Sequence, residues 1–170
     1  QTGAIDTKSI DANQLNLEKS EIASITVKLP TEKFRFERAN EIWLLENYPV
    51  DTMRMNRMLD QMSSLTVDRK ITSKKEKHSK YQLDEQGTTI SLIAESGSEI
   101  LSLIVGKQGA NYQETFVRRS NADDVLAVKS NLGSYKDMDA GSFWDRTITD
   151  LSADQIAAVS FNGDLNYLLR

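Results

Sequence analysis

The stretch that decides the fold consists of two alternating runs, Glu21-Ile-Ala-Ser-Ile-Thr-Val-Lys28 and Phe34-Arg-Phe-Glu-Arg38, separated by the turn residues Pro30-Thr31-Glu32. Apolar and polar residues alternate in both runs, which is the pattern of strands that bury one face. A proline among polar residues between two such runs favours a chain reversal. We therefore predict an antiparallel hairpin at residues 22–38, followed by a third short strand at residues 42–45.

The segment that follows has a different period. Pro49 ends the third strand, and Asp51 can cap a helix because its carboxylate accepts hydrogen bonds from first-turn amides. Apolar residues then recur at spacings of three and four, at Met55, Met58, Leu59, Met62 and Leu65. This spacing predicts an amphipathic helix at about residues 51–65. We interpret its methionines as core residues, with an adaptable interaction surface as the alternative.

Alternating, β-branched segments return after the helix. They predict strands at residues 67–71, 88–94, 100–105, 115–118, 125–128 and 156–161. The four segments from residue 88 to residue 128 form an antiparallel meander. The predicted fold class is therefore α+β: an antiparallel sheet of hairpins and a meander, with one main amphipathic helix packed on one face.

Length and composition fit a water-soluble domain and exclude several kinds of site. The chain has 170 residues, a net charge of -4 and 39% hydrophobic residues. It contains no cysteine, which excludes thiol nucleophiles and thiolate metal sites within this sequence. The longest apolar run, at residues 100–105, is too short to cross a bilayer.

The opening hairpin recurs near the end of the chain. Residues 21–28 match Gln155-Ile-Ala-Ala-Val-Ser-Phe-Asn162, and residues 34–38 match Leu165-Asn-Tyr-Leu-Leu-Arg170. We predict a polar stalk at residues 1–20, an α+β repeat unit at residues 21–154, and the opening hairpin of a second, truncated repeat at residues 155–170. The alternative is a complete domain that ends in a C-terminal hairpin.

A basic stretch is the candidate interaction surface. Its six cations are Arg69, Lys70, Lys74, Lys75, Lys77 and Lys80, and we expect the run from Lys74 to Lys80 to form an exposed loop. Such a patch can contact an acidic partner or anionic lipid, and a plain solvated loop is the alternative. The stretch lacks interleaved aromatic residues and the chain is acidic overall, so we expect no nucleic-acid binding.

We predict no catalytic, metal or cofactor site. His78 lies among lysines with only Glu76 nearby, which makes it a poor general base, and the sequence has no Gly-x-Ser-x-Gly elbow. The run Gly106-Lys107-Gln108-Gly109 lacks the Ser or Thr of a phosphate loop, and we interpret it as a hairpin turn. Asp137-x-Asp139-x-Gly141 begins like a calcium loop but has its glycine misplaced. We interpret Asp145-Arg146, beside two aromatic residues, as a structural ion pair.

A series of short segments carries a family resemblance. They are Ile42-Trp43-Leu44-Leu45, Tyr48-Pro49-Val50-Asp51, the helix at residues 55–65, Val67-Asp68-Arg69, Tyr81-Gln82-Leu83, Leu103-Ile104-Val105-Gly106, Phe116-Val117-Arg118 and Phe143-Trp144-Asp145-Arg146-Thr147-Ile148. In this order and spacing the chain resembles the uncharacterised bacterial family DUF4340, over about residues 22–170. One departure is Gln82, where the family more often has glycine before the leucine.

The resemblance implies a location and a role. Members of the family typically begin with one membrane-spanning helix, place the remainder outside the cytoplasm, and often belong to gene groups with ABC-type transport components of the gliding-motility or auxiliary type. No catalytic residues are established for the family, so none is carried over. We therefore expect a non-catalytic, periplasmic domain, anchored through a segment outside this sequence, that supports an ABC-type transport or envelope complex.

The expected partners are proteins, with ABC-transporter subunits as the candidates, and no cofactor is expected. Two other functions stay open. One is a binding module for a small molecule or an envelope polymer, which would need a pocket with convergent polar groups. The less favoured one is a hydrolase. The sequence does not indicate the oligomeric state.

Overall fold

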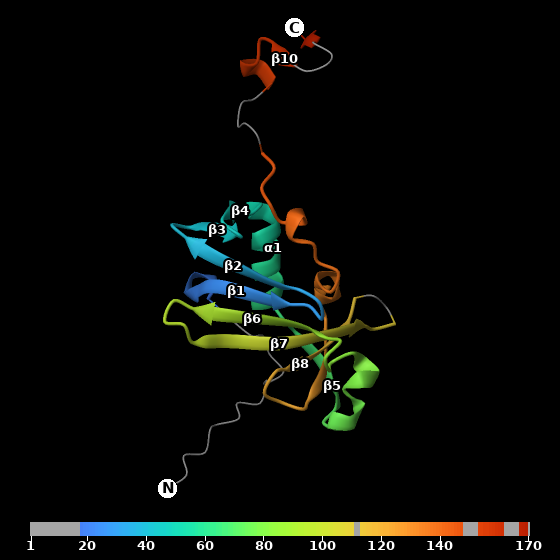
Figure 1. The fold of residues 1–170 in the computed structure, drawn as a ribbon. Helices are drawn as coiled ribbons and strands as arrows, with labels where there is room; N and C mark the ends of the chain where they lie inside the picture. The colour runs from blue at the N-terminus through green and yellow to red at the C-terminus, as the bar shows by residue number, and fades with distance from the viewer. Residues whose placement is uncertain (1–17, 111–112, 148–152, 162–166, 170) are drawn as a thin grey trace.

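The computed structural model describes residues 18–110, 113–147, 153–161 and 167–169 (Figure 1). Most of the predicted stalk, residues 1–17, lies outside the described residues. The first described element is a 3-10 turn, η1 (Lys19–Glu21), which leads directly into the first strand.

A nine-stranded antiparallel sheet forms the body of the structure. Its strands are β1 (Ile22–Lys28), β2 (Lys33–Ala39), β3 (Ile42–Leu45), β4 (Tyr48–Pro49), β5 (Val67–Thr72), β6 (Thr88–Ala94), β7 (Glu99–Gln108), β8 (Thr115–Arg119) and β9 (Val125–Val128). Their spatial order is β4-β3-β2-β1-β6-β7-β8-β9-β5. The predicted hairpin, third strand and meander are confirmed, because each set of consecutive strands occupies neighbouring positions.

The strand register explains the alternation in the sequence. Ile25 lies opposite Phe36 on β2 and opposite Leu92 on β6, while Val27 lies opposite Phe34. All five side chains are buried on the same face of the sheet. The intervening residues of these strands point to the other face.

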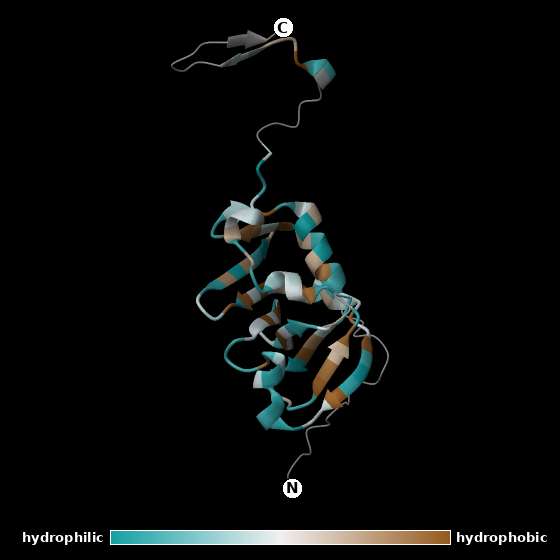
Figure 2. Cartoon of the chain, turned by 90° about the vertical axis from the view of Figure 1, so that its right-hand side faces the viewer, coloured by the Kyte–Doolittle hydropathy of each residue, from teal (hydrophilic) through white to brown (hydrophobic). Residues whose placement is uncertain are grey.

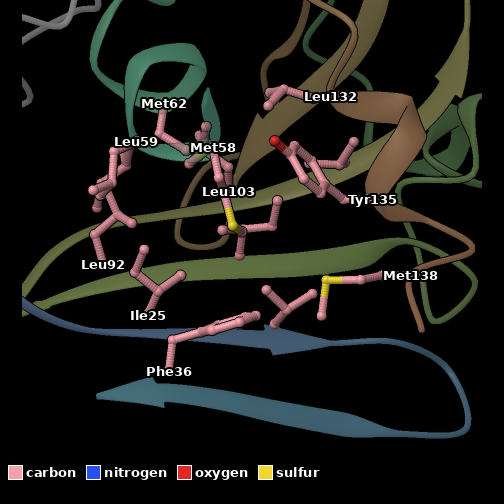
Figure 3. Packing of buried hydrophobic residues seen from close by; sticks show 14 of the residues in the cluster. Ile25, Phe36, Met58, Leu59, Met62, Leu92, Leu103, Leu132, Tyr135 and Met138 are labelled. Atoms are coloured by element: carbon pink, nitrogen blue, oxygen red, sulfur yellow. The ribbon is translucent and has the colours of Figure 1, made fainter. Parts of the chain in front are cut away.

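Helix α1 (Thr52–Ser63) covers the buried face of the sheet (Figure 3). Asp51 caps it as predicted: its Oδ1 accepts a hydrogen bond from the Arg54 amide at 2.9 Å. The helix ends two residues earlier than predicted, where the Ser64 amide bonds to the Asp60 carbonyl. The side chains that pack on the sheet are Met55, Met58, Leu59 and Met62. The interpretation of these methionines as core residues is confirmed.

The chain after β9, residues 129–147, runs back alongside α1 and completes this core. We call it the return segment. It contains the 3-10 turns η4 (Leu132–Tyr135) and η5 (Ala140–Ser142). Leu132, Tyr135, Met138 and Phe143 are buried against the helix and the sheet. Trp144 then forms a bridge with Val50, which fixes this return segment next to β4.

The predicted ion pair between Asp145 and Arg146 is wrong. Asp145 instead bonds to Thr147: hydrogen bonds from the Thr147 side chain and from its amide, the latter to Oδ1 at 2.8 Å, lower the pKa of Asp145. The Arg146 guanidinium donates to the Gly141 carbonyl at 2.9 Å. Both side chains therefore bond within their own loop, where short-range partners are closer than each other.

A second layer covers part of the opposite face of the sheet. We call it the cap segment: residues 73–87, with the 3-10 turns η2 (Lys75–Lys77) and η3 (Ser79–Tyr81). Its Leu83 is fully buried, as are Val125 and Ala127 on β9, and these residues are separate from the core under α1. The predicted exposure of residues 74–80 holds except at His78, but the segment forms two 3-10 turns that pack on the sheet and is not a simple loop.

Strand β7 extends further than predicted. It continues to Gln108, so Gly106 lies within a strand and not in a hairpin turn. A side chain at Gly106 would meet the Tyr81 carbonyl oxygen and the Leu83 side chain of the cap segment. Glycine is needed here because the cap backbone approaches the strand closely.

Both edges of the sheet are protected against further strand pairing. Strand β4 is only two residues long and includes Pro49, which has no amide hydrogen to donate. Strand β5 carries exposed charged residues and two register irregularities in its pairing with β9. Short length, proline, charge and bulges are the features that prevent edge-to-edge association.

The C-terminal part contains a separate two-stranded sheet. It consists of β10 (Val159–Phe161) and β11 (Tyr167–Leu169), which pair antiparallel. A 3-10 turn, η6 (Ala153–Gln155), precedes it. Among the residues that the structure describes, no helix has the length and hydropathy needed to cross a membrane.

Candidate functional site

The predicted basic stretch divides into a neutralised part and an unpaired part. Arg69 bonds to both carboxylate oxygens of Glu114, with Nη2 to Oε2 at 3.1 Å, and pairs with Asp68 at 2.7 Å. The hydrogen bond to Glu114 is the main cause that raises the pKa of Arg69. Lys70 pairs with Asp124 at 2.8 Å, which lowers the pKa of that carboxyl group. Arg69 and Lys70 are therefore held by ion pairs within the fold.

The other four cations lie on the cap segment and are exposed: Lys74, Lys75, Lys77 and Lys80. We call them the lysine surface, and Figure 2 shows that the turns η2 and η3 are predominantly hydrophilic. None of the four forms an ion pair with another described residue. The Lys80 Nζ lies 5.8 Å from the centroid of the Tyr81 ring, and Lys107 approaches the same ring at 5.7 Å. Positive charge is thus concentrated around one aromatic ring.

The lysine surface is held in a fixed position on the sheet. His78 is buried, and its Nε2 donates to the Asp123 carbonyl at 2.9 Å. Arg118 Nε donates to the Leu83 carbonyl at 2.8 Å, and the Tyr81 ring packs on Phe116 with centroids 4.8 Å apart. These contacts join the cap segment to β8 and to the loop before β9.

The same contacts explain the role of the single histidine. The Nε2 atom of His78 is already occupied by a backbone carbonyl, which requires a proton on that nitrogen. The side chain is only 5% exposed. This arrangement attaches the cap segment to the sheet.

Sequence reasoning missed a groove between α1 and the return segment, which we call the helix groove. It has a volume of about 370 Å³. One wall is formed by Arg54, Arg57 and Gln61 of α1, the other by Ser134, Asp137 and Asp139, and the floor by Tyr135, Met138 and Phe143. A hollow of about 410 Å³ beyond Arg54 and Asp139 extends it toward Trp144. The spacing of Arg54, Arg57 and Gln61 by three and four residues is the signal that could have indicated one polar wall.

A third hollow, of about 470 Å³, lies beside β5 and is lined by ion-paired residues. Asp68 accepts from Lys129 at 3.0 Å and from Arg69, and these bonds lower its pKa, with the bond from Lys129 as the main cause. Glu114 is buried against Arg69. Its charged groups already satisfy one another, so this hollow offers little to a ligand.

The arrangement of acidic residues bears on metal binding. In the described part of the chain, no three His, Cys, Asp or Glu side chains come together in a way that could hold a metal ion. Asp137 and Asp139, which begin the calcium-like sequence pattern, are two exposed residues on one wall of the helix groove.

Comparisons with known proteins give one match. No curated protein and no solved structure matches the chain. The model of a family described as a domain of unknown function, DUF4340, matches residues 43–170. That range extends from β3 through the helix, the cap segment, the meander and the return segment to the C-terminal hairpin. The chain therefore belongs to the DUF4340 family.

Proposed function

We propose that this chain is a non-catalytic interaction domain of a membrane-anchored protein, located on the periplasmic side of the inner membrane. In this proposal it supports an ABC-type transport or envelope complex through protein contacts. The family is described only as a domain of unknown function, so support for this role comes from the resemblance given above, which implies such an anchor and gene context. The chain itself contributes a rigid sheet with surfaces available for a partner.

The observation that carries the proposal is the lysine surface. Its four ammonium groups have no ion-pair partner among the described residues, although Glu114, Asp68 and Asp124 neutralise the neighbouring cations. The cap segment that carries them is attached to the sheet through His78, Leu83 and Arg118. A fixed patch of unpaired positive charge suits an acidic protein surface, because little ordering is needed on binding.

The test is an affinity purification of the full-length, membrane-anchored protein in mild detergent, followed by mass spectrometry. The informative variant replaces Lys74, Lys75 and Lys77 by glutamate. A matched control replaces Lys28 and Lys33 by glutamate, since both are exposed lysines at the turn of the β1–β2 hairpin. We expect ABC-transporter subunits with the wild-type protein and the control, and their loss with the triple variant.

Two results would contradict the proposal. Recovery of the same subunits by the triple variant would place the contact elsewhere than the lysine surface. Recovery of the bait alone, by wild-type protein and control alike, would remove the support for an accessory role. Circular dichroism of each variant distinguishes a lost contact from a lost fold.

A binding module is the second candidate function, and the helix groove favours it. The groove combines an apolar floor with polar groups on both walls, which is the usual composition of small-molecule sites. Its volume of about 370 Å³ lies near the lower limit of such sites.

We also propose that residues 155–170 open a second unit of the same fold. Two observations support this. The turn η6 occupies the positions that the sequence match pairs with η1; η1 leads directly into β1, and η6 precedes β10 by three residues. In both hairpins apolar residues lie opposite apolar residues: Ile25 with Phe36 and Val27 with Phe34 in one, Val159 with Leu169 and Phe161 with Tyr167 in the other.

If residues 155–170 belong to a second unit, the nine-stranded sheet should fold without them. We expect a chain shortened to residues 1–147 to unfold at the same temperature and with the same cooperativity as the chain of 170 residues. A markedly lower melting temperature would indicate that the C-terminal hairpin belongs to the first unit.

A further inference from the structure

The helix groove places opposite charges on its two walls without pairing them. Arg54 and Arg57 are exposed on α1, and Asp137 and Asp139 are exposed on the return segment. None of these four side chains forms an ion pair with another described residue, although ion pairs within 4.0 Å occur elsewhere in the same structure. All four charged groups are therefore available to a ligand in the groove.

The width of the groove is fixed at both ends. At one end the Tyr135 hydroxyl donates to Gln61 Oε1 at 2.7 Å, which joins the return segment to α1. At the other end the Asp51 amide donates to the Phe143 carbonyl at 2.8 Å. Both hydrogen bonds join the chain after β9 to α1 or to its N-cap residue, so they fix the spacing of these two elements.

The floor of the groove is apolar. Tyr135, Met138 and Phe143 line it and are 6–8% exposed, so they offer the groove a small apolar surface. Arg57 is close enough to Tyr135 to oppose electrostatically the effect of burial on its phenol. The cationic wall therefore extends over the floor at this point.

We propose that the helix groove binds a short zwitterionic peptide, with the carboxylate on Arg54 and Arg57, the ammonium group on Asp137 and Asp139, and apolar side chains on the floor. Two arginines one turn apart can share a carboxylate, which arginine recognises through paired donors. Two extended residues separate the termini of a dipeptide by about 7 Å. A free amino acid carries the same two charges but has only one side chain for the floor.

This inference is independent of the proposed accessory role, since it concerns the opposite face of the sheet from the lysine surface. A ligand with only one charge would leave one wall unpaired. A purely apolar ligand would leave both walls unpaired. The zwitterionic dipeptide satisfies the walls and the floor together.

The experiment is isothermal titration of the whole chain with L-leucyl-L-leucine at low ionic strength. Three matched probes follow: the N-acetylated dipeptide, the dipeptide amide and free leucine. Hydrogen bonds to charged groups contribute about 1.5–3 kcal/mol each, so removal of either charge is expected to weaken binding about tenfold or more. Inorganic phosphate, an anion without an ammonium group, is expected to compete only weakly.

Two charge-neutralising variants identify the walls. Arg57→Gln is expected to weaken dipeptide binding about tenfold while leaving the affinity for the amide unchanged. Asp137→Asn is expected to do the same while leaving the affinity for the acetylated dipeptide unchanged. Arg35→Gln is the matched control, because Arg35 is an exposed residue of β2 on the opposite face of the sheet.

Several outcomes would overturn the proposal. Absence of heat with the dipeptide, confirmed by unchanged thermal stability at high ligand concentration, would exclude the ligand class. Equal affinity for the acetylated dipeptide would show a site for anions only. Equal weakening by Arg35→Gln would show non-specific charge attraction. The melting temperature of Arg57→Gln is the folding control: if it falls, Asp137→Asn alone tests the walls.

Discussion

The closest approach between the cap segment and the sheet gives a sharp test of the fold. A methyl group at Gly106 would overlap the Tyr81 carbonyl oxygen and lie 2.9 Å from Leu83 Cδ2. Carbon atoms in contact are about 3.5–4.0 Å apart, so the Leu83 side chain would have to move by roughly 0.6–1.1 Å, and the closer Tyr81 carbonyl by more. The obstacle includes backbone, which cannot rotate away as a flexible side chain can.

The substitution Gly106→Ala is therefore expected to be costly. Overpacking of this kind costs about 1–3 kcal/mol, and the hydrogen bond from Arg118 to the Leu83 carbonyl, at 2.8 Å, would weaken as well. We expect the free energy of unfolding to fall by about 2–3 kcal/mol. For a chain of this size that corresponds to a melting temperature lower by about 4–12 °C.

Urea unfolding followed by circular dichroism measures the loss, and hydrogen exchange locates it. The amides of Tyr81 and Leu83 bond to the His78 carbonyl, so their exchange should accelerate when the cap segment is displaced. Gly97→Ala is the matched control: Gly97 has φ of 82° but open space around it, so it should cost only about 1 kcal/mol of backbone strain. Wild-type stability and exchange in Gly106→Ala would refute the packing of the cap segment on β7.

Three further predictions concern the helix, the core and the groove. Asp51→Ala removes the cap of α1 and should lower the free energy of unfolding by about 1 kcal/mol in a urea titration. Leu103→Ala, at a 2% exposed core position, should lower it by about 2–5 kcal/mol in the same assay. Burial raises the pKa of Tyr135 to about 12, so its phenol stays protonated in the fold between pH 10 and 12 while it ionises in the unfolded chain. The stabilisation by the protonated phenol is complete below pH 10 and is lost as the pH rises to 12. In Tyr135→Phe the urea midpoint should therefore decline less over this range. An equal decline in the variant would contradict the assignment.

The features that the sequence predicted well are local. The spacing of Met55, Met58 and Met62 defines the buried face of α1, and Asp51 marks its start. The alternation in residues 22–38 defines the hairpin and its buried face. Each of these depends on residues close together in the chain, whose periodicity directly reflects which side is buried.

The features that the sequence did not predict depend on distant residues. His78 is buried because it bonds to a carbonyl 45 residues away, and Leu83 because Arg118, 35 residues away, holds it. The walls of the helix groove meet through the bond between Tyr135 and Gln61, which are 74 residues apart. A lysine-rich run therefore resembled a free loop, although one histidine and one leucine attach it to the sheet.

The two candidate surfaces are arranged so that they can act separately. The helix groove lies on the face of the sheet covered by α1, while the lysine surface lies on the cap segment over the opposite face. Because both sheet edges are blocked, by Pro49 on β4 and by bulges on β5, a partner must use side-chain surfaces and not an added strand. Residues of the two surfaces share no contacts, so replacing residues of one surface should leave binding at the other unchanged. Peptide affinity that changes when Lys74, Lys75 and Lys77 are replaced would therefore indicate that the sheet couples the two faces.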